Sequence, residues 1–502
     1  MKKKELAPLQ AKKLVAQSSP VLQKEETGSF LPDVLSVEED RDSGKTGIQE
    51  KGDCMKLEFC ATVYENGIPR TTRELVPFAD DGGREEQLIN LYPQMTYQTL
   101  DGFGGAITDS AAYIYSLLNE NQKRELLESY FGPDQMRYRF VRIPIDSCDF
   151  SISHYEADGE EEDENLEHFS FERVERYILP MLRDAEAVFG GKIEIMLTPW
   201  SPPAYMKSNG QRNFGGKLRA CYQKRWAEYI CRYIQEYRSR GFHVTMLTLQ
   251  NEPKAVQTWD SCIFTAQEEK EFLCNAMWPA LTAHGLNDIE IYIWDHNKER
   301  AFEWAQTIID EKTDAMIAGI AFHWYSGDHF EVLRMIRERF PGKKLLLSEA
   351  CIEFRKYRAE DYLGNAEKYA HELIGNLNEG MCVFLDWNLI LDEVGGPNHV
   401  GNYCDAPFLF HTGEKRLMQR EIQRYLEHFT RYLTPGSVRI GFSRYTDQIE
   451  LTAFQNGNAL VVVFLNRTEK PLPAYLRVHD QCVPVFIAPR SIATGVITDY
   501  QN

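Results

Sequence analysis

The chain has 502 residues, of which 43% are hydrophobic and 12% aromatic, and its 56 basic and 75 acidic residues give a formal net charge of −19. This length fits a large domain together with a companion domain. The negative charge argues against nucleic acid and anionic membranes as partners, and no apolar run is long enough for stable insertion into a bilayer.

Residues 1–54 are polar and charged and show no sustained hydrophobic period, which predicts a mobile N-terminal tail. The basic start, Met1-Lys-Lys-Lys, is not followed by the apolar segment of a signal peptide. The 11 cysteines show neither regular spacing nor a Cys-x-x-Cys pair, which favours a reducing compartment. Together these features predict a cytoplasmic protein.

Strand-like segments in residues 55–96 are followed, over residues 97–431, by an alternation of apolar strands and amphipathic helices. The clearest helix carries an apolar stripe at i, i+3 and i+4 spacing, formed by Trp226, Tyr229, Ile230, Tyr233, Ile234 and Tyr237. Eight strands are predicted, at residues 98–103, 139–144, 192–198, 243–249, 290–294, 318–323, 344–348 and 381–387.

This alternation predicts an α/β fold whose catalytic part is a (β/α)8 TIM barrel. A doubly wound open sheet would show the same alternation, but no Gly-x-Gly-x-x-Gly follows the first strand. After residue 431 the pattern changes to short strands separated by Gly-Asn and Pro turns. We therefore expect a flanking all-β sandwich domain over residues 432–502, joined by the N-terminal strands of residues 55–96.

Two glutamates stand at the ends of apolar runs, Glu252 in Leu247-Thr-Leu-Gln-Asn-Glu-Pro and Glu349 in Leu345-Leu-Leu-Ser-Glu-Ala. An acidic side chain at the end of a buried strand is desolvated and needs either a partner or a chemical task. In a barrel, both would lie at the same mouth. Two carboxylates that face one cavity can break a glycosidic bond, whereas the alternative is a pair of structural salt bridges.

Several segments resemble glycoside hydrolase family 30, the glucosylceramidase-like enzymes. The resemblance covers residues 56–502, and its segments follow one another in the family's order. They are Leu100-Asp-Gly-Phe-Gly-Gly-Ala-Ile-Thr-Asp-Ser, Thr198-Pro-Trp-Ser-Pro-Pro-Ala-Tyr-Met-Lys, Leu249-Gln-Asn-Glu-Pro, Phe322-His-Trp-Tyr, Leu347-Ser-Glu-Ala-Cys, Asp386-Trp-Asn-Leu and Gly395-Gly-Pro-Asn-His-Val-Gly-Asn.

The resemblance implies a retaining mechanism in which Glu349, after strand seven, is the nucleophile and Glu252, after strand four, is the acid/base. In such a pair the charge on Glu349 is expected to keep Glu252 protonated until the sugar is attached. The resemblance also assigns Asn251 to the sugar 2-hydroxyl and Asp109 to the distal hydroxyls of a terminal glucose. The alternative for Asp109 is the start of a helix.

The remaining candidate substrate-binding residues are aromatic or polar groups near strand ends. An indole offers a flat apolar surface to the C–H face of a sugar, although Trp324 fits ordinary core packing as well. The resemblance places Trp200 and Trp387 in the glucose subsite and gives residues at the sixth strand a role in orienting the nucleophile. The full set is Trp200, Trp324, Trp387, His323, Tyr325 and Asn402, the last of which also fits a turn.

No His-Glu-x-x-His or Cys/His cluster is present, so neither a catalytic metal nor a cofactor is expected. The predicted function is removal of a terminal β-glucosyl unit from a β-glucoside or oligosaccharide, of glucosylceramidase or β-glucosidase type. β-Xylosidase and β-1,6-glucanase activity of the same fold are alternatives. An inactive carbohydrate-binding protein on this scaffold is a further alternative. Such a protein is expected to lack one of the two carboxylates, and this chain has both. A phosphate-binding barrel is disfavoured, and the sequence does not indicate the oligomeric state.

Overall fold

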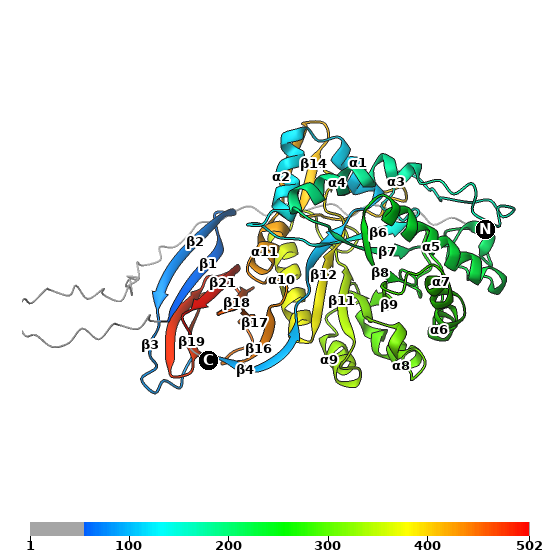
Figure 1. Ribbon diagram of the computed structural model, residues 1–502. Helices are drawn as coiled ribbons and strands as arrows, with labels where there is room; N and C mark the ends of the chain where they lie inside the picture. Colours follow the sequence, from blue (N-terminus) through cyan, green and yellow to red (C-terminus); the bar gives the residue numbers. More distant parts are fainter. Residues whose placement is uncertain (1–54, 501–502) are drawn as a thin grey trace, which may run out of the picture. The chain divides into compact units, whose positions relative to one another are not determined.

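A computed structural model describes residues 55–500 and consists of a closed barrel and a β-sandwich (Figure 1). The mobile tail predicted for residues 1–54 lies outside the described residues. The barrel and its flanking sandwich confirm the predicted fold class. The eight parallel barrel strands are β5 (Gly102–Ala106), β6 (Phe140–Ile145), β7 (Glu194–Pro199), β8 (His243–Thr248), β9 (Glu290–Asn297), β10 (Gly319–His323), β11 (Lys344–Glu349) and β12 (Met381–Asp386).

Seven of these strands begin within two residues of the predicted positions, but the first does not. Gln98 and Thr99 end β4 (Leu88–Thr99), where Thr99 pairs with Val438 of the sandwich. The barrel begins only at Gly102. The strand pattern thus runs on from one sheet into the next, which hides the boundary in the sequence. Gly104 is required in β5, because a Cβ there would lie 2.2 Å from the carbonyl oxygen of Phe140 on the neighbouring strand.

Helices surround the barrel, and the predicted apolar stripe lies on α5, where all six of its side chains are buried. The helices are α1 (Asp109–Ser116), α2 (Glu120–Phe131), α3 (Glu172–Arg176), α4 (Ile178–Phe189), α5 (Gln223–Ser239), α6 (Ala266–Phe272), α7 (Trp278–Ala283), α8 (Ala301–Ile308), α9 (Phe330–Arg339), α10 (Tyr362–Asn378) and α11 (Glu421–Thr430). A small sheet after the last barrel strand contains β13 (Leu391–Asp392), β14 (Phe408–His411) and β15 (Arg416–Gln419).

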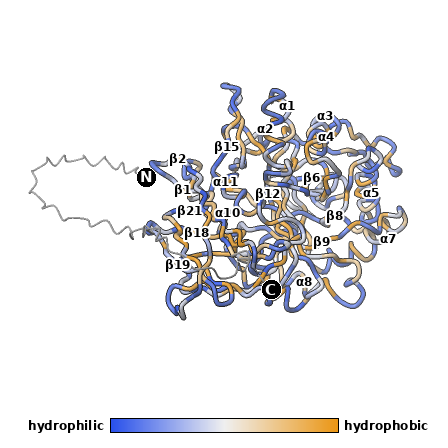
Figure 2. The backbone as a smooth tube through the Cα atoms, turned by 60° about the vertical axis from the view of Figure 1, so that its left-hand side comes forward, coloured by the Kyte–Doolittle hydropathy of each residue, from blue (hydrophilic) through white to orange (hydrophobic). Residues whose placement is uncertain are grey.

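The sandwich is built from strands that precede and follow the barrel, joined in one sheet of order β2-β1-β21-β18-β17-β16-β4-β19-β20-β3. In Figure 2 the hydrophobic colours in this part gather around β18 and β19, which face the sandwich core. The strands not yet named are β1 (Lys56–Glu65), β2 (Ile68–Pro77), β3 (Ala79–Asp80), β16 (Val438–Arg444), β17 (Glu450–Asn456), β18 (Ala459–Asn466), β19 (Leu472–Val478), β20 (Gln481–Ile487) and β21 (Ser491–Thr498).

Four sandwich strands, β2, β3, β16 and β21, have no counterpart among the sequence-based predictions, and two of them show why. Strand β2 pairs only with β1 and is largely exposed, so its sequence is polar and lacks the alternation of a half-buried strand. Strand β21 lies between β1 and β18, but its core positions include small residues such as Ala493 and Gly495. Neither strand therefore carries the long run of large apolar residues that marks β18.

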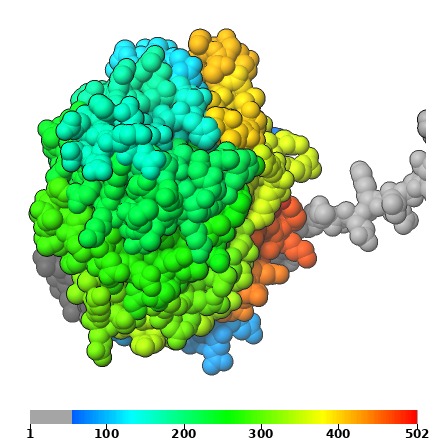
Figure 3. All heavy atoms as spheres, turned by 90° about the vertical axis from the view of Figure 1, so that its right-hand side faces the viewer, coloured from blue at the N-terminus to red at the C-terminus, as the bar shows by residue number. Residues whose placement is uncertain are grey.

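Helices α10 and α11 form the contact between the barrel and the sandwich (Figure 1). Arg490 donates two hydrogen bonds to the carboxylate of Glu367 on α10, at 2.6 and 2.9 Å. Asn378, the last residue of the same helix, donates to the carbonyl of Leu451 at 2.9 Å. In Figure 3 one face of the molecule consists almost wholly of barrel segments, coloured cyan to yellow, with sandwich residues at its edge. The sandwich therefore supports one side of the barrel.

His428 on α11 is buried at this contact in its neutral form. Its Nε2 lies 2.9 Å from Oγ1 of Thr62, and its Nδ1 lies 2.9 Å from Oγ1 of Thr494. The Thr494 hydroxyl itself donates to the carbonyl of His428, so Nδ1 is the protonated nitrogen and Nε2 accepts from Thr62. Burial lowers the pKa of His428 from 6.5 to about 3. Protonation is therefore favoured in the unfolded chain.

We expect acid to weaken the fold through this histidine. The stability that neutral His428 contributes is complete above pH 6.5 and is lost as the pH falls toward 3. Lowering the pH from about 7.5 to about 5 should cost about 2 kcal/mol at this site. Urea denaturation of wild type and His428→Gln at both pH values tests this, because the variant should lose that part of the pH dependence. The exposed His243→Gln is the control, and an equal pH dependence in all three proteins contradicts the prediction.

Candidate active site

A cavity of about 300 Å³ lies at the carboxyl ends of the barrel strands, where catalytic residues of such barrels gather. Its walls combine acidic, amide and aromatic side chains. They are Asp149, Phe150, Trp200, Asn251, Glu252, Gln257, Trp259, His296, Asn297, Tyr325, Glu349, Cys351, Glu353, Trp387, Asn402 and Cys404. The residues come from the ends of most of the strands, so the barrel's closure is what assembles them.

Glu252 and Glu349 both line this cavity. Glu349 is the last residue of β11 and is buried. Its Oε2 accepts a hydrogen bond from Nη1 of Arg142 at 2.6 Å, and its Oε1 accepts one from the Tyr325 hydroxyl at 2.9 Å. Glu252 follows β8 with a φ of +46°, which is uncommon for a residue other than glycine. Its backbone N–H donates to the carbonyl of Asp295 at 2.9 Å.

Arg142 on β6 lies at the centre of the polar network beneath the two glutamates. Besides Glu349, it contacts Oδ2 of Asp295 at 2.9 Å and donates to Oδ1 of Asn251 at 2.8 Å. Burial alone would lower the pKa of Arg142, but the charges of Asp295 and Glu349 outweigh that effect and raise it. A permanent positive charge therefore fixes Glu349 and Asn251 relative to each other.

Asp295 accepts four side-chain hydrogen bonds in this network. They come from Arg142, from Nε2 of His323 at 3.1 Å, from Ser348 at 2.5 Å and from Thr248 at 2.8 Å. Burial raises the pKa of Asp295, but the charge of Arg142 and the hydrogen bond from His323 lower it well below its ordinary value. Asp295 therefore stays ionised and holds both Arg142 and His323 in position.

Two histidines flank the carboxylate of Glu252. Nδ1 of His323 lies 3.3 Å from Oε1, and Nδ1 of His296 lies 3.4 Å from the same oxygen. Burial raises the pKa of Glu252, yet the hydrogen bond from His323 and the nearby imidazoles bring it below its ordinary value. Burial lowers the pKa of His323, but Glu349, Asp295 and Glu252 raise it to about 9. The contact with His323 therefore favours the ionised form of Glu252, whereas the charge of Glu349 alone, considered in the sequence analysis, favours its protonated form.

Asp149 is another acidic group of the cavity wall. Its Oδ2 accepts hydrogen bonds from Nδ2 of Asn402 at 3.0 Å and from Nδ2 of Asn398 at 3.3 Å. Burial raises the pKa of Asp149 to about 7, with the charges of Glu349 and Glu252 adding to the effect and the two asparagines opposing it. A polar group held by amides in this way can accept a hydrogen bond from a sugar hydroxyl.

The comparisons with known proteins agree with this geometry. The glycosyl hydrolase family 30 TIM-barrel domain matches residues 100–433, and the family's β-sandwich domain matches residues 436–495. The chain belongs to glycosyl hydrolase family 30. It is thus a glycoside hydrolase, and the resemblance seen in the sequence is confirmed.

Relatives within family 30 carry more than one activity in their names. The chain is 29% identical over 404 residues to the lysosomal acid glucosylceramidase of Mus musculus. The aligned part covers 77% of this chain and 78% of the relative. Among solved structures, SrfJ from Salmonella typhimurium matches with a TM-score of 0.85 and 34% identity over 88% of this chain and 100% of that one. An endo-β-1,6-glucanase matches with a TM-score of 0.77 and 26% identity, over 89% and 100% of the two chains.

Five of the eight predicted sugar-binding residues line the family 30 cavity, and three, Asp109, His323 and Trp324, lie elsewhere. Trp200, Trp387, Asn251, Tyr325 and Asn402 are in its wall. Trp324 lies outside that wall, because its indole is buried against Tyr369 and donates to the carbonyl of Cys351. His323 is fully buried behind the cavity and reaches Glu252 from there. The roles of the residues in the wall stay predictions.

Asp109 also lies outside the cavity wall, which corrects the position expected for it. It is the first residue of α1, and its carboxylate accepts two hydrogen bonds from Arg173, at 2.7 and 2.8 Å, and one from the N–H of Ile152. Its side chain is 1% exposed. Asp149, four residues beyond the end of β6, takes the place in the wall. An acidic residue so soon after a buried strand is the signal that the sequence analysis missed.

Arg142 and Asp295 were missed as well, although each has a signal in the sequence. Arg142 is a charged residue inside the otherwise apolar strand Phe140–Ile145, and Asp295 lies within Glu290–Asn297. A buried charge needs a partner, so two such residues of opposite sign point to an internal ion pair. The sequence does not show that this pair also holds Glu349.

Two groups of described residues carry donors close enough to hold a metal ion, namely Glu252 with His296 and His323, and His154 with Asp260 and His399. In the first group His323 already bridges Glu252 and Asp295. A metal there would occupy the carboxylate of Glu252, which is predicted to be the acid/base. Among residues 55–500, no helix is both long and apolar enough to span a membrane, and the cytoplasmic location stays a prediction.

Proposed function

We propose that this family 30 enzyme removes a terminal β-glucosyl unit with retention of configuration, with Glu349 as nucleophile and Glu252 as acid/base. The observation that supports this most directly is the presence of both carboxylates in the wall of one cavity, at the ends of β8 and β11. Glu349 is bound by Arg142 and Tyr325, and Glu252 by His323. The better-anchored carboxylate is suited to attack carbon, and the one beside an imidazole is suited to exchange a proton.

In the first step, an oxygen of Glu349 forms a bond to the anomeric carbon while the bond to the aglycone oxygen breaks. The leaving oxygen takes a proton from Glu252. In the second step, water gives its proton to Glu252 and attacks the same carbon, and the ester bond to Glu349 breaks. Two displacements at one carbon restore the original β configuration.

The proton for the first step comes from His323 in this proposal. In the free enzyme the proton resides on His323, whose Nδ1 lies 3.3 Å from Oε1 of Glu252. Transfer along this hydrogen bond produces the protonated Glu252 that the leaving group requires. Because Asp295 contacts Nε2 of His323 at 3.1 Å, the imidazole keeps its orientation whether or not it carries the extra proton.

The cavity suits a single terminal sugar ring. Trp200 and Trp387 stack on each other with ring centroids 5.4 Å apart and present aromatic surface to the cavity. In this proposal Asn251, which accepts a hydrogen bond from Arg142, contacts the 2-hydroxyl, while Asp149 and Asn402 contact the distal hydroxyls. The glucosylceramidase name of the mouse relative supports glucose as that ring. The endo-β-1,6-glucanase relative makes β-1,6-glucan the second candidate substrate.

A panel of substrates tests this proposal. We expect p-nitrophenyl β-glucoside to give the highest kcat/KM, ahead of the β-xyloside, β-fucoside and β-galactoside, and glucosylceramide in detergent to be hydrolysed. The first product seen by ¹H NMR should be β-glucose. Higher kcat/KM on β-1,6-glucan would favour the second candidate. A preference for xyloside contradicts the sugar assignment, an α-anomer contradicts retention, and inertness toward every substrate supports a binding protein.

A further inference from the structure

Three loops at the mouth of the barrel bring two histidines and an aspartate together beside the catalytic cavity. His154 follows β6, Asp260 follows β8 and His399 follows β12. One ligand atom from each lies within 4.8 Å of the others. We propose that His154, Asp260 and His399 bind a divalent transition-metal ion of the Zn²⁺ type. This group, called the rim site below, shares no residue with the wall of the cavity.

His399 is prepared to act as a ligand. Its Nδ1 lies 3.1 Å from the carbonyl oxygen of Ser151, which can only accept a hydrogen bond, so Nδ1 carries the proton. Its Nε2 is buried and has no hydrogen-bond partner among the described residues. Nε2 therefore carries a lone pair that no described residue engages, and it is the nitrogen available to a metal ion. A backbone carbonyl that fixes the second nitrogen in this way is the usual outer partner of a metal-binding histidine.

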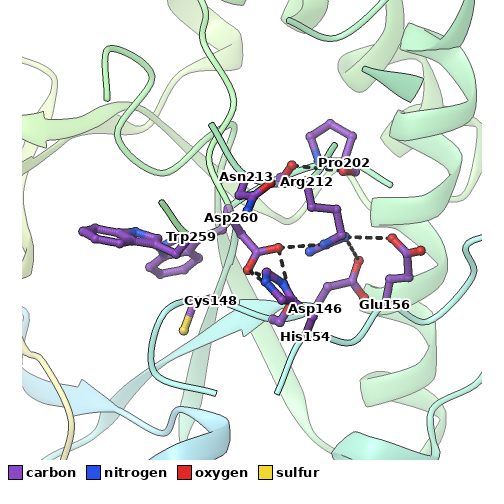
Figure 4. Close-up of polar contacts among 12 residues, drawn as sticks. Asp146, Cys148, His154, Glu156, Pro202, Arg212, Asn213, Trp259 and Asp260 are labelled. Atoms are coloured by element: carbon purple, nitrogen blue, oxygen red, sulfur yellow. Dashed lines mark hydrogen bonds and ion pairs between the residues drawn. The ribbon is translucent and has the colours of Figure 1, made fainter. Parts of the chain in front are cut away.

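Asp260 binds an arginine through one oxygen and faces His154 with the other (Figure 4), and the Ser147 hydroxyl lies 3.3 Å from both oxygens. Oδ1 accepts from Nε of Arg212 at 2.7 Å, while Oδ2 lies 3.4 Å from Nδ1 of His154. Arg212 is also paired with Asp146 at 3.3 Å and Glu156 at 3.2 Å. Three carboxylates against one guanidinium give these groups a net charge of −2 when all are ionised. That excess of negative charge favours a divalent cation.

His154 gives the rim site access to solvent. Its side chain is 46% exposed, whereas Asp260 is fully buried. The imidazole rings of His154 and His399 meet edge to face, with centroids 4.4 Å apart. An ion can therefore enter past His154, and water can fill the coordination position that three protein ligands leave open. Two imidazoles and one carboxylate are the donors of zinc-type sites, whereas Ca²⁺ and Mg²⁺ prefer oxygen ligands throughout.

An ion in the rim site would tie together the loops that form one side of the sugar cavity. Trp259, next to Asp260, lines the cavity. Asn398, next to His399, binds Asp149, which belongs to the same loop as His154. The ion would therefore restrain this wall without contacting the reacting atoms.

Zn²⁺ binding to the full chain tests the proposal by competition with a chromophoric chelator. We expect one ion bound at the rim site, and His154→Gln or His399→Gln should weaken that binding by at least about 10-fold. His296→Gln is the matched control, because it removes a ligand of the other donor group, Glu252 with His296 and His323. The ion at the rim site should remain bound in this variant, and Ca²⁺ should not compete for it. Circular dichroism checks that each variant is folded.

A folded His154→Gln or His399→Gln variant that binds Zn²⁺ as tightly as the wild type overturns the proposal. So does a loss of all Zn²⁺ binding in His296→Gln alone, since the ion would then belong to the catalytic cavity. A rise in Tm with Zn²⁺ in the wild type, absent in both rim-site variants, supports it.

Discussion

Replacing Glu349 with alanine should lower kcat on p-nitrophenyl β-glucoside by on the order of 10⁴-fold or more, as for other residues that form the covalent intermediate. The proposed mechanism gives the reason, because Glu349 is the nucleophile in it and, among the described residues, the carboxylate that both Arg142 and Tyr325 bind. Arg142 lies 2.6 Å from the carboxylate that is removed. Its charge should therefore attract a small anion into the vacated space.

Azide should restore part of the rate of Glu349→Ala by occupying that space and attacking the anomeric carbon. Because this is a single displacement, the product should be α-glucosyl azide, which ¹H NMR identifies. Glu353→Ala is the control, since Glu353 also lines the cavity but is not bound by Arg142. Azide should not accelerate that variant. Near-normal turnover of Glu349→Ala without azide would show that the nucleophile is misassigned.

Replacing Glu252 with alanine should slow substrates according to their need for a proton. Hydrolysis of a disaccharide or alkyl β-glucoside, whose leaving oxygen must be protonated, should fall by about 10²–10⁴-fold. The first step on 2,4-dinitrophenyl β-glucoside should be much less affected, because that leaving group departs as an anion. The glycosyl ester on Glu349 should then accumulate, since no base activates water, and a burst of dinitrophenol should be seen.

The azide product distinguishes the role of Glu252 from that of Glu349. With Glu252→Ala it should attack the ester on Glu349 and give β-glucosyl azide, the opposite anomer from that expected with Glu349→Ala. His243→Gln serves as the control, because His243 is exposed and begins β8, the strand that precedes Glu252. Equal slowing of activated and unactivated substrates would argue against Glu252 as the general acid.

Much of the barrel could be predicted because its signals are local. Each strand is a short apolar run, and seven of eight starts lie within two residues of the prediction. The exception, β5, is rich in glycine and follows directly on a sandwich strand, so neither composition nor pattern marks its start. Strand β2 was missed because its exposure allows a polar sequence.

The candidate site was only partly predictable, because the hydrophobic pattern of a strand does not show which way the loop after it turns. Asp109 and Asp149 both follow barrel strands closely, yet Arg173 binds Asp109 outside the cavity, while Asn402 binds Asp149 in its wall. The state of Glu252 also depended on residues distant in sequence. The charge of Glu349 alone favours its protonated form, but the structure adds His296 and His323 beside it.

The family, the barrel with its sandwich and the pair Glu252 and Glu349 could be predicted from the chain, because strand ends and motifs depend only on neighbouring residues. Which polar side chains meet became visible only in the folded protein. There Arg142 pairs with both Asp295 and Glu349, and Asp149 rather than Asp109 lies in the cavity wall. His154, Asp260 and His399 come together from three loops. Such contacts arise from barrel closure, which brings together strand ends separated by a hundred residues or more and leaves no trace in local spacing.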